Sequence, residues 1–575
     1  MARSNPQPSR RNVAASSPQQ QQHPGAFTKS ARRAAVAAKL GGGGTSWRQR
    51  VLQWLRGMTL VMVAVLVAAA LVGCVMYMYV VPMLHVGCGY AAKTVCSGVF
   101  VSGRSLEHLW LWELGVSPLL PLVSVSIDRT TQRVRVAMFG GVLQAEAMHH
   151  GAHLGCSLLT SASRVPLSFN RTWSESGVDL EEEAAAWLGV EDSEWLTNEE
   201  LVPERERLDL DAVRRVVARE FDRSQMPASC HTRAIVVAHA GKVVAEQYDD
   251  GIDRHTPLLG WSMTKSLLST LIGMRIADGE LALNDTVHHA AWNCDAASVV
   301  ARSRSRQRTL MAAAPASATA AGLVRTRDDA LCRVTVEQLL RMNSGLPFDE
   351  AYTPTGDPTR MLFSEHSTAE FAAQRALEQP HEGTRWHYSS GSTNLLSHVL
   401  QSTFSSQRDY LSYPLRLFRA LGLRSAVIEV DPAGTFVGSS FSYMSARDWA
   451  RFGLLYLNDG MWLGRRILPA NWLKVTTKPT PGSHGLYGAH WWLNMFAGAT
   501  ATKRPPTHDV WGKFAWLAAL PHDAFFAAGH EGQLVMVIPS RELVVVRLGF
   551  NTDETAWDRV RFFTDLLREI PAAPA

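Results

Sequence analysis

At 575 residues the chain is long enough for more than one domain. Its 46% hydrophobic and 19% charged residues exclude a wholly disordered protein and permit a large core. The net charge is +5, but residues 1–56 contribute +10 from ten Lys/Arg and contain no Asp or Glu, so the remainder carries −5. The basic charge therefore belongs to the N-terminal tail, and we expect no nucleic-acid partner for the folded body.

The first 46 residues have the composition of a disordered tail. They are rich in Ser, Gln, Pro, Ala and Gly, and they include a glutamine run from Gln19 and a glycine run from Gly41. Because nothing in this stretch could bury a core, we predict a disordered basic tail over residues 1–46.

A transmembrane anchor is predicted over residues 47–86. Residues 58–84 run for 27 positions without a charge, which is enough to span a bilayer with some tilt. Three arginines precede the run, and Tyr77 and Tyr79 lie toward its far end as interface anchors. We therefore expect a single-pass membrane protein with a cytoplasmic N-terminus, an exoplasmic body and the lipid bilayer as a partner.

The N-terminal basic tail is also compatible with a second location. An acid-free stretch rich in Arg, Ser and Ala resembles a mitochondrial transit segment, which would place the protein in the mitochondrial inner membrane. Two sequons, at Asn170 and Asn284, would be usable in a secretory compartment. The leader alone leaves both locations open.

The cysteines fit an oxidising compartment. Six follow the span, an even number that permits disulfides but leaves 15 pairings open; they are Cys88, Cys96, Cys156, Cys230, Cys294 and Cys332. No Cys/His cluster has the spacing of a zinc site, so we predict no structural metal.

Residues 87–206 are predicted to form a β-rich accessory region and an acidic linker. Three alternating stretches separated by turn residues, 122–128, 134–139 and 142–148, indicate short strands. Residues 178–206 are acidic and fit a solvated linker. The pattern does not indicate what the accessory region does.

A larger domain is predicted over residues 207–568. Each end contains a β-hairpin, with strands at 234–239 and 243–248 and at 533–539 and 542–548. Residues 300–328 are rich in Arg and Ser and then in Ala, and we expect a low-complexity surface insertion there.

Ser262 and Lys265 form a candidate catalytic pair within this domain. Apolar residues recur at helical spacing from Leu267 to Ile276, so Ser262 is expected at a helix N-terminus with Lys265 one turn on. A serine hydroxyl needs a base within hydrogen-bond reach, and a buried lysine with a lowered pKa can supply it. This S-x-x-K is the only one in the chain.

Two further motifs follow in order. Residues 386–394 (WHYSSGSTN) lead into a predicted helix and contain Tyr388, and residues 529–533 (GHEGQ) enter the last hairpin. Together with Ser262/Lys265 they resemble the serine β-lactamase and penicillin-recognising superfamily, in its class C-like, membrane-anchored branch of β-lactamase-related serine hydrolases. The resemblance covers about residues 230–550. It implies an α+β fold in which an antiparallel sheet is flanked by helices and joined to a mostly helical part.

The resemblance also implies a mechanism without metal or cofactor. Ser262 would form an acyl-enzyme, while Lys265 and Tyr388 would share the proton transfers, in an order that the sequence leaves open. The backbone N–H groups of Ser262 and Gln533 would form the oxyanion hole. Substrate would be bound by residues of the second and third motifs: Ser390, His530 and Gly532.

Two departures from the family pattern bear on the substrate. Ser390 stands where the class C pattern has asparagine, and His530-Glu531-Gly532 replaces Lys-Thr-Gly. A histidine is only partly charged near neutral pH and would grip a penicillin carboxylate less firmly than lysine. We therefore expect a hydrolase of small esters or amides, such as an esterase, an amidase or a D-amino peptidase, rather than a true β-lactamase. The alternatives are an inactive binding or assembly protein and a transpeptidase-like cell-wall enzyme.

Overall fold

The computed structural model describes residues 47–115, 122–151, 153–160, 208–292, 331–375, 385–495, 514–570 and 572. The predicted disordered tail, the acidic linker and the low-complexity insertion lie outside these residues. The chain divides into two compact units, Met1–Tyr77 and Met78–Ala575.

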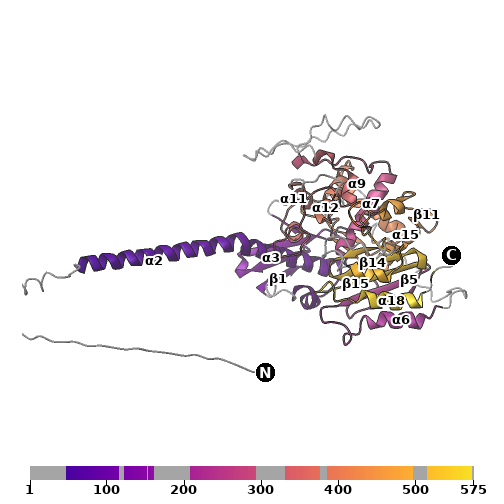
Figure 1. Ribbon diagram of the computed structural model, residues 1–575, viewed down its shortest axis with the longest axis horizontal. Coiled ribbons are helices and arrows are strands. Elements are labelled where there is room, and N and C mark those ends of the chain that lie inside the picture. Colours follow the sequence, from indigo (N-terminus) through magenta and orange to yellow (C-terminus); the bar gives the residue numbers. More distant parts are fainter. Residues whose placement is uncertain are drawn as a thin grey trace, which may run out of the picture. The chain divides into compact units, whose positions relative to one another are not determined.

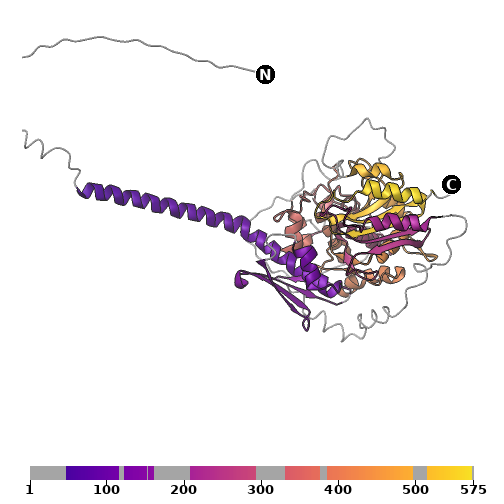
Figure 2. The same cartoon turned by 90° about the horizontal axis from the view of Figure 1, so that it is seen from below.

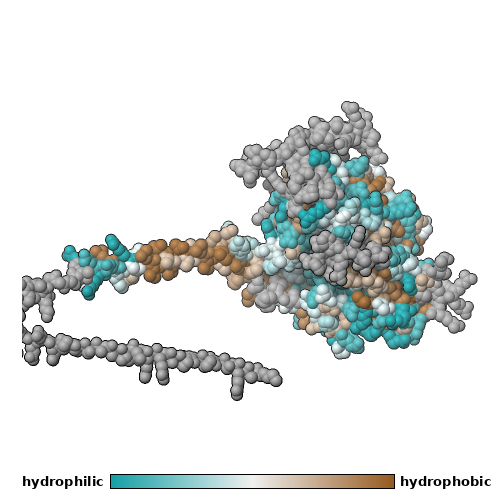
Figure 3. Space-filling model, viewed as in Figure 1, coloured by the Kyte–Doolittle hydropathy of each residue, from teal (hydrophilic) through white to brown (hydrophobic). Residues whose placement is uncertain are grey.

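The first unit contains the helix α2 (Trp47–Val75). Its apolar side chains are exposed, and Figure 3 shows them as a continuous brown band after a hydrophilic start. Among the described residues, one helical stretch, Trp47–Val101, is long and apolar enough to cross a membrane, and none of its most apolar part is buried. Length and composition thus fit the predicted anchor, although a signal sequence near an N-terminus can have the same properties.

The second unit begins with a helix packed on a small sheet. The helix α3 (Val81–Cys96) contacts the middle of an antiparallel four-stranded sheet. The strands occur in chain order across the sheet: β1 (Ser124–Asp128), β2 (Arg133–Met138), β3 (Leu143–His149) and β4 (Cys156–Leu159). The first three lie where the alternation predicts strands. A disulfide joins Cys96 at the end of α3 to Cys156 at the start of β4.

A buried ion pair joins α3 to the larger domain. The Lys93 ammonium contacts the Glu429 carboxylate, and both side chains are almost inaccessible to solvent. Glu429 also accepts hydrogen bonds from Ser97 Oγ and from the Cys156 amide, each at 2.8 Å. The backbone of α3 also approaches the backbone of the larger domain closely at Gly89. A Cβ added to this glycine would lie 1.9 Å from the Phe363 carbonyl oxygen. The accessory region and the larger domain therefore share one packed interface.

The larger domain is built on an antiparallel six-stranded sheet in the order β12-β13-β14-β15-β5-β6. Its strands are β5 (Thr232–His239), β6 (Lys242–Tyr248), β12 (Trp492–Leu493), β13 (Phe525–Gly529), β14 (Gln533–Ile538) and β15 (Leu543–Gly549). Helices α6 (Leu210–Arg219) and α18 (Arg559–Glu569) cover one face, and α15 (Ala446–Leu457) covers the other (Figure 1). The three central strands, β14, β15 and β5, are buried throughout their length.

A mostly helical part completes this domain. Its helices are α7 (Thr264–Ala277), α9 (Val336–Leu340), α10 (Asp357–Phe363), α11 (Thr368–Ala373), α12 (Ser390–Ser402), α13 (Gln407–Ser412), α14 (Pro414–Leu421) and α16 (Trp472–Thr477). A three-stranded sheet lies beside it, formed by β7 (Leu258–Leu259), β8 (Val427–Ile428) and β9 (Ser442–Met444). The predicted α+β class is confirmed.

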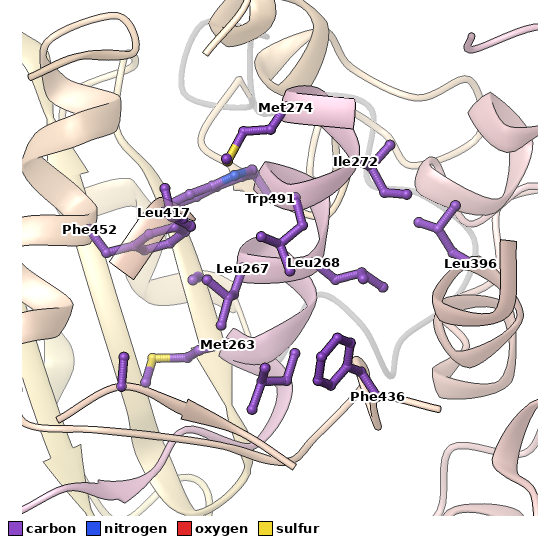
Figure 4. Packing of buried hydrophobic residues seen from close by; sticks show 14 of the residues in the cluster. Met263, Leu267, Leu268, Ile272, Met274, Leu396, Leu417, Phe436, Phe452 and Trp491 are labelled. Carbon is purple, nitrogen blue, oxygen red and sulfur yellow. The ribbon is translucent and has the colours of Figure 1, made fainter. Parts of the chain in front are cut away.

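The helix α7 lies at the centre of the largest apolar cluster. Eleven consecutive residues of α7, from Thr264 to Met274, are buried. Leu267 and Leu268 point to different neighbours, and Figure 4 shows side chains from several elements on both sides of the helix. Because close-packed interiors resist small shifts, this packing fixes the position of the residues at the start of α7.

We predict that Glu429→Ala destabilises the folded chain strongly. The substitution leaves the Lys93 ammonium buried without its partner, so the free energy of unfolding should fall by about 3–5 kcal/mol. The measurement is denaturant unfolding of the detergent-solubilised full chain at pH 7. Glu365→Ala is the control, because its 3.6 Å contact with Arg360 is partly exposed and should be worth less than about 1 kcal/mol. Equal effects of the two substitutions would contradict the prediction.

Candidate active site

Ser262 and Lys265 meet at the junction of a short 3₁₀ turn, η8 (Trp261–Met263), and α7. Lys265 Nζ donates to Ser262 Oγ at 2.9 Å. The same ammonium donates to Ser390 Oγ and to the Ser439 carbonyl oxygen, each at 3.0 Å. Lys265 is 1% exposed, so these oxygens replace the water that an exposed lysine would bind.

Tyr388 joins the pair from the turn that precedes α12. Its side chain lies beside that of Ser262, and Lys265 Nζ lies 4.8 Å from its ring centroid. The ring stacks on Trp492 at 5.3 Å and meets the edge of Tyr487 at 5.8 Å. The structure thus brings together all three residues that the sequence proposes for proton transfer.

The pKa values of Lys265 and Tyr388 are shifted in opposite directions. Burial lowers the pKa of Lys265 to about 8, although the nearby Glu350 carboxylate opposes the change. Burial, followed by the neighbouring Tyr487 and Glu350, raises the pKa of Tyr388 well above its usual range. Near neutral pH an appreciable fraction of Lys265 is therefore uncharged, whereas Tyr388 remains a neutral phenol. Of the two groups, Lys265 is thus the one whose pKa is moved toward neutral pH.

Glu350 is a site residue that the sequence analysis did not identify. Its carboxylate accepts from Ser390 Oγ at 2.5 Å and from the Ser390 backbone N–H at 2.9 Å. A chain of contacts therefore runs from Ser262 through Lys265 and Ser390 to Glu350. Glu350 lies in an irregular segment between α9 and α10, where no spacing rule marks a lone glutamate. Ser390, predicted to bind substrate, already has two polar partners within the protein.

The third motif lies against the serine turn. A Cβ on Gly529 would lie 2.3 Å from the Gly260 carbonyl oxygen, so β13 passes directly beside that turn. Gln533 follows at the start of β14, and its side-chain amide exchanges two hydrogen bonds with the Gly549 backbone, at 2.6 and 3.0 Å. Gly532 has φ +85°, and a Cβ there would overlap Arg547 Nη1 at 2.5 Å. These side-chain and backbone constraints hold the Gln533 position rigidly.

Aromatic rings gather around His530. The His530 ring stacks on Tyr352 with centroids 4.6 Å apart and meets Trp261 edge-on at 5.4 Å. Trp261 Nε1 also donates to the Glu531 carboxylate at 2.9 Å. Because Trp261 directly precedes Ser262, this ring cluster and the rings around Tyr388 both lie close to the serine turn. The predicted substrate-binding roles of Ser390, His530 and Gly532 stay predictions.

A family model described as beta-lactamase matches residues 224–562, more than half of the chain. The chain belongs to the β-lactamase family. This confirms the resemblance drawn from the three motifs and identifies the protein in broad terms as a serine hydrolase. A search of curated proteins gives no match.

Solved structures of several hydrolases also match part of this chain, at low sequence identity. A putative 6-aminohexanoate-dimer hydrolase from Bacillus anthracis is 18% identical, with a TM-score of 0.40 over 58% of this chain and 78% of that one. A putative β-lactamase from Bacteroides dorei is 13% identical, with a TM-score of 0.43 over 63% and 99%. The hydrolase EstCE1, with promiscuous acyltransferase activity, is 16% identical, with a TM-score of 0.42 over 62% and 96%.

We predict that Glu350→Gln moves the pH profile of this β-lactamase family member to lower pH. The glutamate charge favours the Lys265 ammonium, so its removal should lower the lysine pKa from about 8 by about one unit. A base must lose its proton to act; the rate therefore rises with pH through this pKa, and the midpoint of the rise should follow it downward. The rate of labelling of Ser262 by a fluorophosphonate probe, measured from pH 5 to 10, reports that midpoint.

A matched control is available for this experiment. Glu370→Gln removes a carboxylate on α11 that is nearly half exposed and contacts His289 instead. Its profile should match that of the wild type. An unchanged midpoint in Glu350→Gln, or an upward shift, would contradict the electrostatic role of Glu350.

Proposed function

We propose that this protein is a membrane-anchored serine hydrolase that acts through an acyl-enzyme on an uncharged ester or amide. The observation that carries the proposal is the 2.9 Å contact between Ser262 Oγ and the buried Lys265 amine, with the Tyr388 phenol beside both. A lysine with a pKa of about 8 is matched to proton transfer near neutral pH.

The acylation step can be written with the residues at hand. Neutral Lys265 accepts the Ser262 proton as the oxygen attacks the substrate carbonyl carbon, and the oxyanion lies between the Ser262 and Gln533 backbone N–H groups. The resulting ammonium restores a proton to Tyr388 as the phenol protonates the departing alcohol or amine. The carbon–heteroatom bond of the substrate then breaks, and the Ser262 ester remains.

Deacylation uses the same groups in reverse. A water molecule attacks the ester carbonyl and gives its proton to Lys265, and Ser262 regains a proton through Tyr388 as the acid leaves. Ser390 and Glu350 act in both halves by holding the Lys265 amine toward Ser262. No step requires a metal or a cofactor.

The proposed preference for uncharged substrates rests on the charges around Ser262. Lys265 donates to three oxygens of the protein, and Glu350 adds a negative charge close by. His530 replaces a permanent cation of the family pattern, and its ring lies on Tyr352. An aromatic site whose third motif lacks a permanent cation favours esterase, amidase or D-amino peptidase chemistry over the binding of a penicillin carboxylate.

A non-catalytic binding or assembly role is the second candidate. It would explain a family fold without turnover, but it gives no reason for a buried lysine to be held on a serine hydroxyl. A transpeptidase-like reaction would use the same acyl-enzyme with an amine in place of water. The geometry of Ser262 serves both acceptors.

The proposed location follows from the apolar helix and the disulfide. The span would place the N-terminus in the cytoplasm and the hydrolase domain on the exoplasmic side, or would cross the mitochondrial inner membrane. The Cys96–Cys156 disulfide supports an oxidising compartment, which the secretory lumen and the mitochondrial intermembrane space both provide.

We expect a fluorophosphonate probe to label the wild-type chain and not Ser262→Ala. In Lys265→Met the probe should label Ser262 at least about 10²-fold more slowly, because the general base is lost. Tyr388→Phe should acylate but release amine or alcohol products more slowly than the wild type. Equal labelling of wild type and Ser262→Ala, or no labelling of either, would exclude the proposed nucleophile.

A substrate panel tests the proposed charge preference. The wild type should hydrolyse p-nitrophenyl esters or D-alanyl amides with a kcat/KM at least about tenfold above that for nitrocefin, which carries a carboxylate. His530→Lys should raise the nitrocefin value relative to the ester value, because it restores a permanent cation. A nitrocefin preference in the wild type would identify a true β-lactamase instead.

Glycosylation distinguishes the two proposed locations. The Asn284 side chain is exposed, so a hydrolase domain in the secretory lumen should carry a glycan there. Glycosidase treatment should then increase the mobility of the full chain, and the combined substitution Asn170→Gln/Asn284→Gln should abolish that change. An unmodified wild type that fractionates with mitochondria would favour the inner-membrane alternative.

A further inference from the structure

Three large apolar side chains are exposed together at one end of the accessory sheet. Leu122 precedes β1 and is 57% exposed, whereas Phe139 and Val142 lie in the turn between β2 and β3 and are 60% and 80% exposed. The β1–β2 register pairs Ser124 with Ala137, so Leu122 lies at the same end as that turn. We call these three residues the sheet tip.

The disulfide determines which end of α3 the sheet tip lies beside. Cys96, at the last turn of α3, is bonded to Cys156, which pairs with His149 at the end of β3. The helix packs along β2 and β3, and it is about 24 Å long against about 20 Å for β3. Its first turn therefore lies at the Leu143 end of β3, next to the sheet tip (Figures 1 and 2).

The first turn of α3 is also the end of the predicted membrane span. The uncharged run extends to Leu84, and α3 begins at Val81. Leu84 is buried in the same apolar cluster as Met138 and Leu143, which flank the β2–β3 turn. The sheet tip thus lies level with the point at which the chain would leave the bilayer.

The distribution of charge differs between the two ends of the accessory sheet. Residues 136–145, which include the turn, carry no charge. The opposite end pairs Asp128 with Arg133 and continues into the exposed Arg129. A surface that is apolar near the membrane exit and charged about 17 Å away fits a protein that stands on a bilayer with this edge at the interface.

The conformation of the turn adds to this pattern. Phe139 has φ +51°, an unfavourable value for an aromatic residue, and it is followed by Gly140 and Gly141 at φ +67° and +97°. The backbone thus accepts strain at a residue whose ring is left in solvent.

We propose that the sheet tip inserts into the bilayer interface beside the transmembrane helix, as a second and non-covalent membrane contact. The proposal rests on the membrane anchoring put forward under Proposed function. With two contacts, the hydrolase domain would be held at a fixed orientation and height above the lipid surface instead of moving freely about its anchor. The lipid headgroup and upper acyl region is the partner.

The test uses the full chain reconstituted in phosphatidylcholine vesicles with environment-sensitive NBD labels. One sample carries the label on native Cys74 within the span. Two further variants in a Cys74→Ser background carry it at Val142→Cys and, as a matched control, at Arg129→Cys on the opposite end of the same sheet. Quenching is measured with nitroxide-bearing lipids and, separately, with aqueous iodide.

We expect lipid-borne nitroxide to quench the labels at positions 74 and 142 at least twofold more than the label at 129, and iodide to show the reverse order. If lipid-borne nitroxide quenches the label at position 74 but the labels at 142 and 129 are quenched equally, the sheet-tip proposal is overturned while the anchor stands. No lipid quenching at 74 would overturn both. Protection of 142 from iodide without lipid quenching, and only at high protein density, would show that a second copy covers the tip and would also overturn the proposal.

Discussion

The burial of one lysine amine organises this molecule. Lys265 is surrounded by the largest apolar cluster, yet its three hydrogen bonds all go to oxygens held by separate segments of the chain. Burial without an adjacent full counter-charge makes the ammonium costly, which is why its pKa falls to about 8. Since a lysine in water would stay protonated and inert, the packing of α7 supports both the fold and the chemistry that we propose.

The sequence predicted the part of this site that short spacings encode. Ser262 and Lys265 are one helical turn apart, and Tyr388 precedes a helix with its own side-chain cap at Ser389, so local patterns place them. The contacts that only the tertiary fold creates were missed. Glu350 reaches Ser390 from an irregular segment, and Lys93 meets Glu429 across 336 positions of the chain. The short strand β4 was also missed, since four residues carry too little alternation to mark it.

The accessory region contributes to the site in a way that its composition did not reveal. A cavity of about 30 Å³ separates α3 and the residues that follow it from the serine turn, and its lining includes Tyr90, Glu113, Trp261 and Gln533. That volume holds one or two water molecules, and no substrate. Residues of α3 and of the turn that carries Ser262 therefore line the same small cavity.

The His530 departure from the family pattern and the Glu350 carboxylate act in the same electrostatic direction. Replacing the lysine of the third motif by His530 removes a permanent positive charge, and Glu350 adds a negative one at Ser390. Acylation requires neutral Lys265, and in that state the lysine does not balance the negative charge of the Glu350 carboxylate. A carboxylate-bearing substrate would add an uncompensated charge among aromatic rings, where poor solvation makes it most costly. Under the proposed function, the glutamate that raises the lysine pKa would also disfavour anionic substrates, so one residue would influence both reactivity and specificity.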